Sequence, residues 1–125
     1  GFDVLAESRG YTASHQVLTR HGALDSGAGA KAAALLEQAG IITNMNMLPG
    51  DTKAMSPSGL RLGVQELTRV GFSQDDMAEV ARFYARVLLN GEDPSTVKID
   101  VHALKEQHQI IRYCFNEDER SGYPR

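Results

Sequence analysis

The segment Gly59–Gly63 reads Gly-Leu-Arg-Leu-Gly, with one arginine between two leucines and a glycine at each end. Side chains alternate between the two faces of a β-strand, so Leu60 and Leu62 would point to the face opposite Arg61. The leucines would anchor the strand in a core, while the flanking glycines would let a ligand or another backbone approach closely. The segment therefore predicts a sheet with one face in the core and one face open to a partner of the arginine.

Short apolar or β-branched runs in the first half of the chain predict the other strands. Phe2–Leu5 and His15–Arg20 are two such runs, and we expect them to pair with each other. Gly40–Thr43 is a third. The stretch Asn44–Gly59 contains two prolines, two glycines and no helical period, so it predicts a long loop.

The first of three expected helices is alanine-rich and runs through residues 28–38. Asp25 or Ser26 can cap its start, and Gly40 is placed to end it in the left-handed conformation. A second helix is expected to begin at Ser73, because two aspartates follow in its first turn, where negative charge suits the helix dipole.

The second helix should stop at Asn90-Gly91, and a third is expected from about Ser95 to about Cys114. Strands with helices before and after them predict an α+β fold, in which helices cover one face of a small, mainly antiparallel sheet. At 125 residues the chain fits one domain, which we place at residues 1–115, followed by a polar tail at 116–125.

Composition limits the classes of partner. Net charge is −3 and the basic residues are scattered, which is unlike a nucleic-acid-binding surface. No apolar run is long enough to cross a membrane, and a single cysteine suits a reducing compartment. We therefore expect a cytoplasmic protein that binds neither nucleic acid nor membrane.

Two other kinds of site are not predicted. The spelling Gly27-x-Gly29-x-x-Ala32 is like part of a dinucleotide-binding pattern, but no strand immediately precedes it. The four histidines include no pair at a spacing of four residues and have no cysteine partner nearby, so no metal site is expected.

Arg61 is the strongest candidate for a functional side chain. An arginine in this position is most commonly a surface or ion-paired charge. Its glycine neighbours favour a second interpretation, in which the planar guanidinium binds a carboxylate through two parallel, charge-assisted hydrogen bonds. A small anionic substrate would suit that geometry.

Several motifs, in order over about residues 1–115, resemble the C-terminal small domain of serine hydroxymethyltransferase, with a tail like that of the archaeal-type members. They are Thr12-x-x-His15, Ile42-Thr43-Asn44-x-Asn46 leading to Pro49, Ser58-Gly59-Leu60-Arg61-Leu62-Gly63, and Leu67-Thr68-Arg69-x-Gly71-Phe72. The resemblance implies the small domain of a fold-type I enzyme of amino-acid and one-carbon metabolism that uses pyridoxal phosphate.

The resemblance also implies roles for individual residues. Arg61 matches the family's arginine that binds the α-carboxylate of a serine, glycine or threonine substrate. Asn46 matches a position where the pterin of a reduced folate binds. Ser58 and His15 match positions near the site, and we expect them to support the arginine rather than touch substrate.

The chain also departs from the family. It has Gly63-Val64-Gln65-Glu66 where many members have Gly-Thr-Pro-Ala, and Met45 where a lysine is common. These departures leave open a second candidate, the small domain of a threonine transaldolase or aldolase, which would keep the carboxylate arginine and transfer a glycine unit to an aldehyde without a pterin.

The family's pyridoxal phosphate lysine has no counterpart here, because no lysine stands in the threonine-rich setting of that residue. The four lysines are Lys31, Lys53, Lys98 and Lys105. We therefore expect a fragment that is inactive alone and belongs to a larger, dimeric transferase, whose large cofactor-binding domain is absent from this chain. A stand-alone binding module without catalysis is the remaining alternative.

Overall fold

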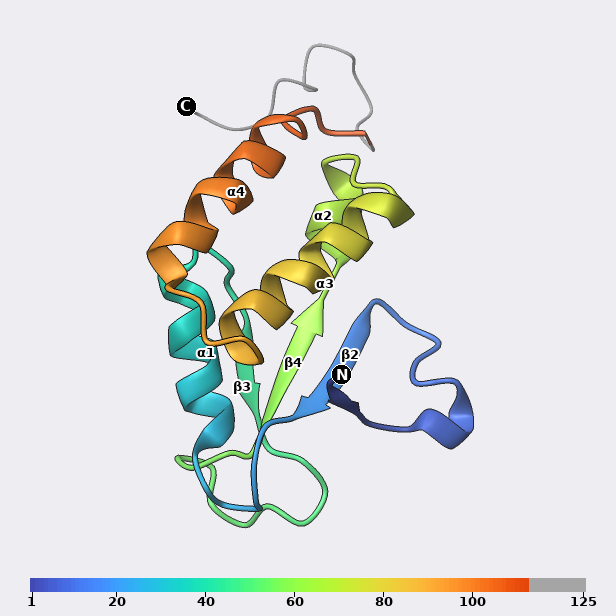
Figure 1. The fold of residues 1–125 in the computed structure, drawn as a ribbon. Helices are drawn as coiled ribbons and strands as arrows, with labels where there is room; N and C mark the ends of the chain where they lie inside the picture. The colour runs from blue at the N-terminus through green and yellow to red at the C-terminus, as the bar shows by residue number, and fades with distance from the viewer. Residues whose placement is uncertain (113–125) are drawn as a thin grey trace.

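The computed structural model describes residues 1–112, which form a four-stranded antiparallel sheet and the helices that pack on it (Figure 1). The strand order is β1-β2-β4-β3. The strands are β1 (Asp3–Val4), β2 (Gln16–Arg20), β3 (Asn44–Asn46) and β4 (Gly59–Gly63). The predicted α+β class, with a small antiparallel sheet, is confirmed.

Strand β4 is interior and is paired along both edges. Five residue pairs join it to β2, from Gln16 opposite Gly63 to Arg20 opposite Gly59. Three pairs join it to β3 on the other side. The expected pairing of the two N-terminal strands is also confirmed, since Asp3 of β1 lies opposite Arg20. Both strands are shorter than their apolar runs.

The third strand is not where the sequence placed it. Gly40–Thr43 was expected to be a strand, but β3 is Asn44–Asn46, inside the segment expected to be loop. Ile42 is 86% exposed, so this apolar side chain does not mark a buried position in a strand. The polar residues pair because β4 offers them a backbone ladder at that point.

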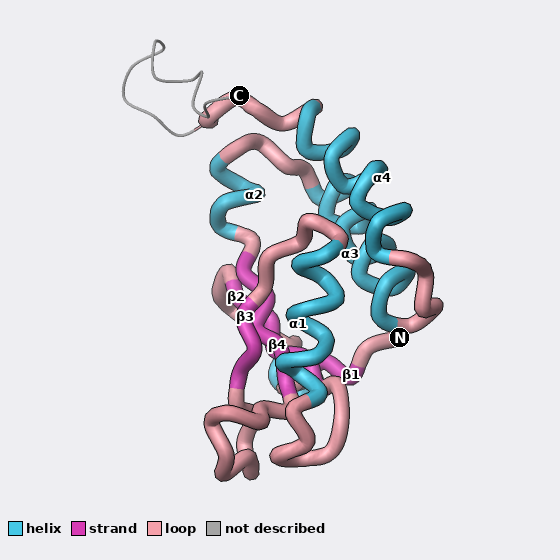
Figure 2. The backbone as a smooth tube through the Cα atoms, turned by 90° about the vertical axis from the view of Figure 1, so that its left-hand side faces the viewer, coloured by secondary structure: helices cyan, strands magenta, loops and turns pink. Residues whose placement is uncertain are grey.

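Helices α1 (Ala28–Gln38), α3 (Gln74–Leu88) and α4 (Pro94–Glu106) lie on one side of the sheet (Figure 2). The core lies between them and β4, and its buried members are Ala32, Leu36, Ala39, Leu60, Phe83, Val87 and Val97. The sequence predicted this one-sided cover. It did not predict α2 (Gln65–Arg69), a short helix that directly follows β4.

Of the two residues predicted to cap α1, Ser26 does so and Asp25 does not. Gly27, with φ of 71°, is the N-cap residue, and the Ser26 hydroxyl before it accepts a hydrogen bond from the N–H of Ala28, the first residue of the helix, over 3.2 Å. The Asp25 carboxylate instead accepts hydrogen bonds from the backbone N–H groups of Thr52 and Lys53. Tertiary contacts therefore displaced this aspartate from the capping role. The expected end is confirmed, since Gly40 has φ of 78°.

The predicted start of α3 is confirmed, but the predicted end of α4 is wrong. Ser73 caps α3 in a capping box with Asp76. Helix α4 ends at Glu106 rather than near Cys114, and Cys114 lies outside the described residues. His108 continues the apolar period of α4 in sequence, but its ring packs at a tilt against Phe72, with ring centroids 4.1 Å apart.

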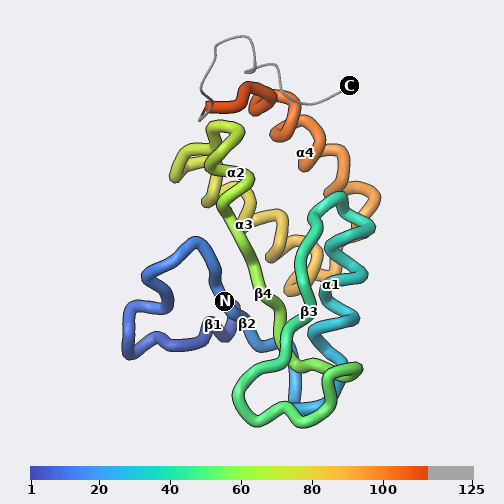
Figure 3. Tube along the Cα trace, turned by 180° about the vertical axis from the view of Figure 1, so that it is seen from behind, coloured from blue at the N-terminus to red at the C-terminus, as the bar shows by residue number. Residues whose placement is uncertain are grey.

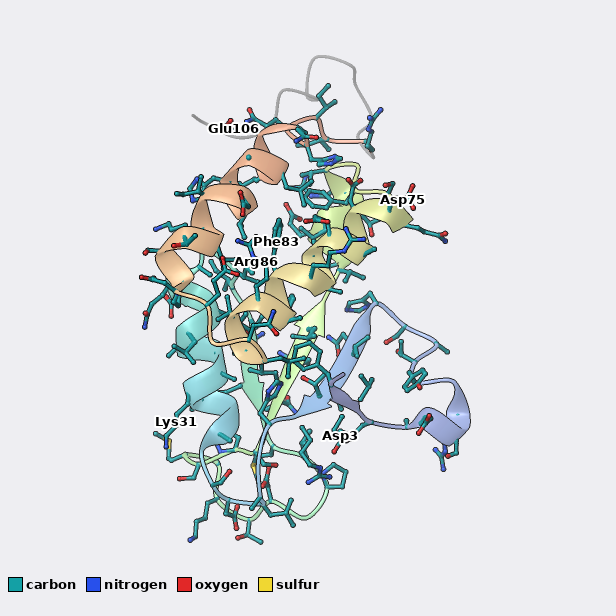
Figure 4. The ribbon with its side chains drawn as sticks, viewed as in Figure 1. Asp3, Lys31, Asp75, Phe83, Arg86 and Glu106 are labelled. Carbon is teal, nitrogen blue, oxygen red and sulfur yellow. The ribbon has the colours of Figure 1, made fainter. Side chains whose placement is uncertain are left out.

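An ion-paired arginine joins α3 to α4. Arg86 of α3 lies 2.6 Å from Asp100 of α4 and 2.6 Å from Glu92 in the loop between the helices. Phe83, one turn earlier, is buried in the core, and Figure 4 labels both residues on α3. These contacts fix the helical layer on its side of the sheet.

Candidate functional site

Arg61 projects from the face of the sheet opposite the helices. Leu60 is fully buried in the core and Leu62 packs against it. Because side chains alternate along a strand, Arg61 between them points to the other face. Figure 3 shows that face, with the strands in front of α3 and no helix of the described residues over them. The two-faced strand predicted from the sequence is therefore present.

Asparagines from β3 share this face with the arginine. Asn44 is the direct cross-strand partner of Arg61, and Asn46 is the partner of Gly59. On the other side of β4, Leu18 of β2 is opposite Arg61. Residues opposite each other in an antiparallel ladder have their side chains on the same face, about 4.5–5.5 Å apart at Cβ. The fold thus gathers one guanidinium and two amides on the face of the sheet that no helix of residues 1–112 covers.

The two arginines on this face differ in their partners. Arg20 of β2 makes an ion pair with Asp3 of β1, with 3.2 Å between Nε and Oδ2. Arg61 is half-buried, and within residues 1–112 no ion pair or side-chain hydrogen bond involves it. Its five N–H donors are therefore available to an anion from outside this part of the chain.

Asn46 is half-buried, and its side-chain amide donates to the Met47 carbonyl over 2.6 Å. This bond orients the amide while leaving its oxygen as an acceptor on the Arg61 face. His15 is exposed immediately before β2, and its backbone carbonyl accepts from the N–H of Val64. The two residues thus lie at opposite ends of the ladders that flank Arg61.

Ser58 is fully buried immediately before β4 and does not face the open surface as a free hydroxyl. Its hydroxyl and its backbone N–H both donate to Asp51, at 2.8 and 3.0 Å. Its carbonyl accepts from the N–H of His21, whose pKa is lowered by burial. Ser58 therefore fixes where β4 begins.

Asp51 is a residue of this region that the sequence did not single out. Its carboxylate also accepts from the backbone N–H groups of Leu48 and Asp25, at 2.8 and 2.7 Å. Burial alone would raise the pKa of Asp51, but hydrogen bonds from Leu48, Ser58 and Asp25 outweigh burial and hold this pKa well below its usual range. Pro49-Gly50 signals a turn there, but no local pattern could reveal the distant donors.

A small cavity of about 220 Å³ lies beside β2, and its wall includes Leu18, the residue opposite Arg61 in the β2–β4 ladder, but not Arg61 itself. Its lining residues are Leu5, Ala6, Tyr11, Thr12, Ser14, Gln16 and Leu18.

Within the described residues, no cluster of three or more histidine, cysteine or acidic side chains is arranged to bind a metal. No helix of that region has the length and apolar character needed to cross a bilayer.

Comparisons with known proteins extend over most of the chain. A family model described as serine hydroxymethyltransferase matches residues 2–84. The chain is 51% identical over 118 residues to the serine hydroxymethyltransferase of Thermococcus kodakarensis, an alignment that covers 93% of this chain and 27% of that protein. It is 47% identical over 120 residues to that of Methanocella arvoryzae, which covers 94% and 28%.

A solved structure shows the same fold. The crystal structure of L-threonine transaldolase from Pseudomonas fluorescens matches with a TM-score of 0.75 and 31% identity, over 86% of this chain and 24% of that one. The chain therefore spans only about a quarter of the length of the relatives it matches.

Proposed function

Since this chain belongs to the serine hydroxymethyltransferase family, we propose that it is the C-terminal small domain of a pyridoxal phosphate-dependent serine/glycine hydroxymethyltransferase-like enzyme. The whole enzyme would be three to four times longer than this chain, because the chain spans about 27% of its archaeal relatives. The remaining polypeptide would contain the large domain, and the complete protein would be a cytoplasmic homodimer of amino-acid and one-carbon metabolism.

The observation that carries this proposal is the guanidinium of Arg61, which has no ion-pair or side-chain hydrogen-bond partner within residues 1–112 and lies on the face of the sheet that the described helices leave uncovered. A planar fork of N–H donors matches the two oxygens of an amino acid's α-carboxylate, and a bidentate pair of this kind is directional as well as strong. By holding the carboxylate in one plane, Arg61 would restrict rotation about the bond to Cα and so select which substituent of Cα reacts.

The lysines of this chain do not fit the role of a cofactor lysine. Lys31 lies on α1, and Lys98 and Lys105 lie on α4, which places all three in the helical layer behind the sheet. Lys53 lies in the loop before β4. Pyridoxal phosphate would supply an acceptor for the electrons of the broken bond when held by the large domain. This chain would recognise substrate and would be inactive alone.

Asn46 fits a hydrogen-bonding role toward a flat heterocycle such as a pterin. Its amide is held by the Met47 carbonyl, and its oxygen lies on the same face as Arg61. We propose that this oxygen accepts from the pterin's ring or amino N–H groups. Ser58 and His15 would support the site through the backbone of β4 and the residue that follows it.

A threonine transaldolase is the second candidate, because a solved enzyme of that name shares the fold. Met45 and Gly63-Val64-Gln65-Glu66 also depart from the common hydroxymethyltransferase pattern. The complete enzyme should be assayed for serine cleavage with and without tetrahydrofolate, and for threonine consumption with an added aldehyde. Pterin-dependent serine cleavage supports the first candidate, while aldehyde-dependent threonine consumption that ignores the pterin supports the second.

The carboxylate assignment has its own test in the complete enzyme. Arg61→Lys should weaken glycine binding, measured by calorimetry, by about 2 to 4 kcal/mol, because a point charge replaces a bidentate fork. Arg20→Lys is the matched control, since Arg20 lies on the same face but is occupied by Asp3. Unchanged glycine affinity in Arg61→Lys would contradict the proposal. A reading frame that starts directly before Gly1 would favour a binding module instead.

A further inference from the structure

Two loops meet at the end of the sheet where β4 begins. Residues 21–27 connect β2 to α1, and residues 47–58 connect β3 to β4. Figures 1 and 3 show both loops at the same end of the sheet. The second loop joins the strand that carries Asn46 to the strand that carries Arg61, so its conformation bears directly on the proposed site.

Each loop contributes an aspartate that binds the other loop. The Asp25 carboxylate accepts from the backbone N–H and the hydroxyl of Thr52, at 2.8 and 2.7 Å, and from the N–H of Lys53 at 2.7 Å. In return, Asp51 accepts from the N–H of Asp25 at 2.7 Å. The Thr52 hydroxyl and the Lys53 N–H hold the pKa of Asp25 below its usual range. The two carboxylates therefore form a reciprocal cross-link.

Asp51 also closes its own loop from within. Its Oδ2 atom accepts from Leu48, the second residue of the loop, and from the N–H and hydroxyl of Ser58, the last. One oxygen atom thus ties the end of β3 to the start of β4. Ser58 and Leu48 are both buried, so water cannot readily replace these bonds.

The residue next to Ser58 is enclosed on both faces of the sheet. The backbone of Gly59 contacts Gly29 of α1 so closely that no side chain fits at Gly29. The Leu48 side chain occupies the space where a side chain of Gly59 would be. Helix α1 and Leu48 thus limit how far β4 can move perpendicular to the sheet. Asp51 binds the backbone of Leu48 and so controls the position of one of these two contacts.

We propose that Asp51 is a positioning residue for substrate recognition. By binding Leu48 and Ser58 together, it sets the register of β4 and its position perpendicular to the sheet, and so places the Arg61 guanidinium where the substrate carboxylate binds. This inference rests on the proposed function. It adds a residue that does not touch substrate and acts through the backbone of β4. An isosteric Asp51→Asn change would present an N–H₂ group to donors that need an acceptor, and so would disturb this link specifically.

The test uses a double-mutant cycle in the complete holoenzyme, with glycine affinity measured by calorimetry well below the unfolding temperature. Asp51→Asn should weaken glycine binding by about tenfold or more, because a displaced guanidinium loses its bidentate geometry. In an Arg61→Ala background, the same Asp51→Asn change should have almost no further effect, since the group it positions is gone. A merely structural role would not produce this non-additivity.

Asp93→Asn is the matched control. Asp93 caps α4 by accepting from the N–H and hydroxyl of Ser95, so its loss also removes carboxylate hydrogen bonds from an N–H and a serine hydroxyl, but at an exposed position in the helical layer. Glycine affinity should stay at the wild-type value in this variant. If Asp51→Asn does not fold, Ser58→Ala removes a single bond to Asp51 and should weaken glycine binding about threefold or more.

The outcomes separate the two proposals. If Arg61→Lys leaves glycine affinity unchanged, the proposed function fails, and this inference fails with it. If Arg61→Lys weakens binding while Asp51→Asn and Ser58→Ala do not, only the positioning role of Asp51 is overturned. Equal losses from Asp51→Asn in the wild-type and Arg61→Ala backgrounds overturn it as well.

Discussion

Asn44 of β3 lies directly opposite Arg61 of β4, on the face of the sheet that the described helices leave uncovered. A carboxylate at position 44 would therefore be within reach of the guanidinium. We predict that Asn44→Asp weakens glycine binding to the complete enzyme by about tenfold or more, because an internal acid would compete with the substrate for the same donors. Calorimetric titration with glycine measures the effect.

The control for this change is Asn44→Ser, which keeps the position polar and adds no charge. Glycine affinity in that variant should stay within about twofold of wild type, a free-energy difference of less than about 0.5 kcal/mol, because substitutions at exposed positions usually have small effects. Equal affinities for the serine and aspartate variants would mean that Arg61 does not bind the carboxylate from this face.

Gly29 in the first turn of α1 should reject a side chain. Replacing a helical glycine by alanine normally stabilises a helix by roughly 0.5–1 kcal/mol. Here the added Cβ would collide with the backbone of Gly59, so we expect Gly29→Ala to destabilise the 125-residue chain by about 2 kcal/mol or more in urea unfolding. Thr96→Ala, at an exposed position of α4, should instead raise stability slightly. A stabilised Gly29→Ala variant would show that α1 does not pack this closely on β4.

Thr43 has the one buried side-chain polar atom of the described residues that lacks a hydrogen-bond partner. Valine has nearly the same shape and no hydroxyl, so Thr43→Val should raise the free energy of unfolding by about 1 kcal/mol. Thr96→Val at the exposed position should change it by less than about 0.5 kcal/mol. Loss of stability in Thr43→Val would indicate that the hydroxyl has a partner outside residues 1–112.

The Asp51 cross-link should make stability depend on acid. A carboxyl whose pKa is lowered in the folded state contributes stability above its unfolded pKa and loses it as pH falls through the folded pKa. The urea midpoint of the 125-residue chain should therefore fall progressively below about pH 5. Asp51→Asn should lower the midpoint at pH 6 and flatten this dependence.

Glu106→Gln at the exposed end of α4 controls for the loss of one negative charge. Its midpoint should follow the wild-type curve over the same pH range. Parallel curves for wild type and Asp51→Asn would show that the hydrogen bonds of Asp51 do not contribute to acid sensitivity.

The sequence predicted correctly those features of the fold that depend on residues close together in the chain. The alternation of Leu60, Arg61 and Leu62 predicted the two faces of β4, and Ser73 predicted the start of α3. Both features depend on neighbours a few residues away in the chain. Gly40 ended α1 for the same reason, since glycine tolerates a left-handed backbone.

The errors arose where distant partners decide the structure. Ile41 and Ile42 favoured a strand at residues 40–43, but the ladder formed by β4 selected the polar Asn44–Asn46 instead. Asp25 does not cap α1, because its carboxylate accepts hydrogen bonds from the backbone N–H groups of Thr52 and Lys53. The matches to Arg61 and Asn46 came from resemblance. No pattern in the sequence could have shown that the two residues share a face, or that Asp51 ties together the ends of the loop between their strands.

The interior position of β4 has a consequence for how an amino acid would be captured. Because hydrogen bonds hold this strand along both edges, the arginine's main chain can shift only if a ladder opens. The backbone part of the conformational entropy of Arg61 is therefore lost during folding rather than at each encounter with substrate. Sequence changes in the surrounding loops could then alter whether a pterin or an aldehyde binds, while the binding of the amino-acid carboxylate to Arg61 stays the same.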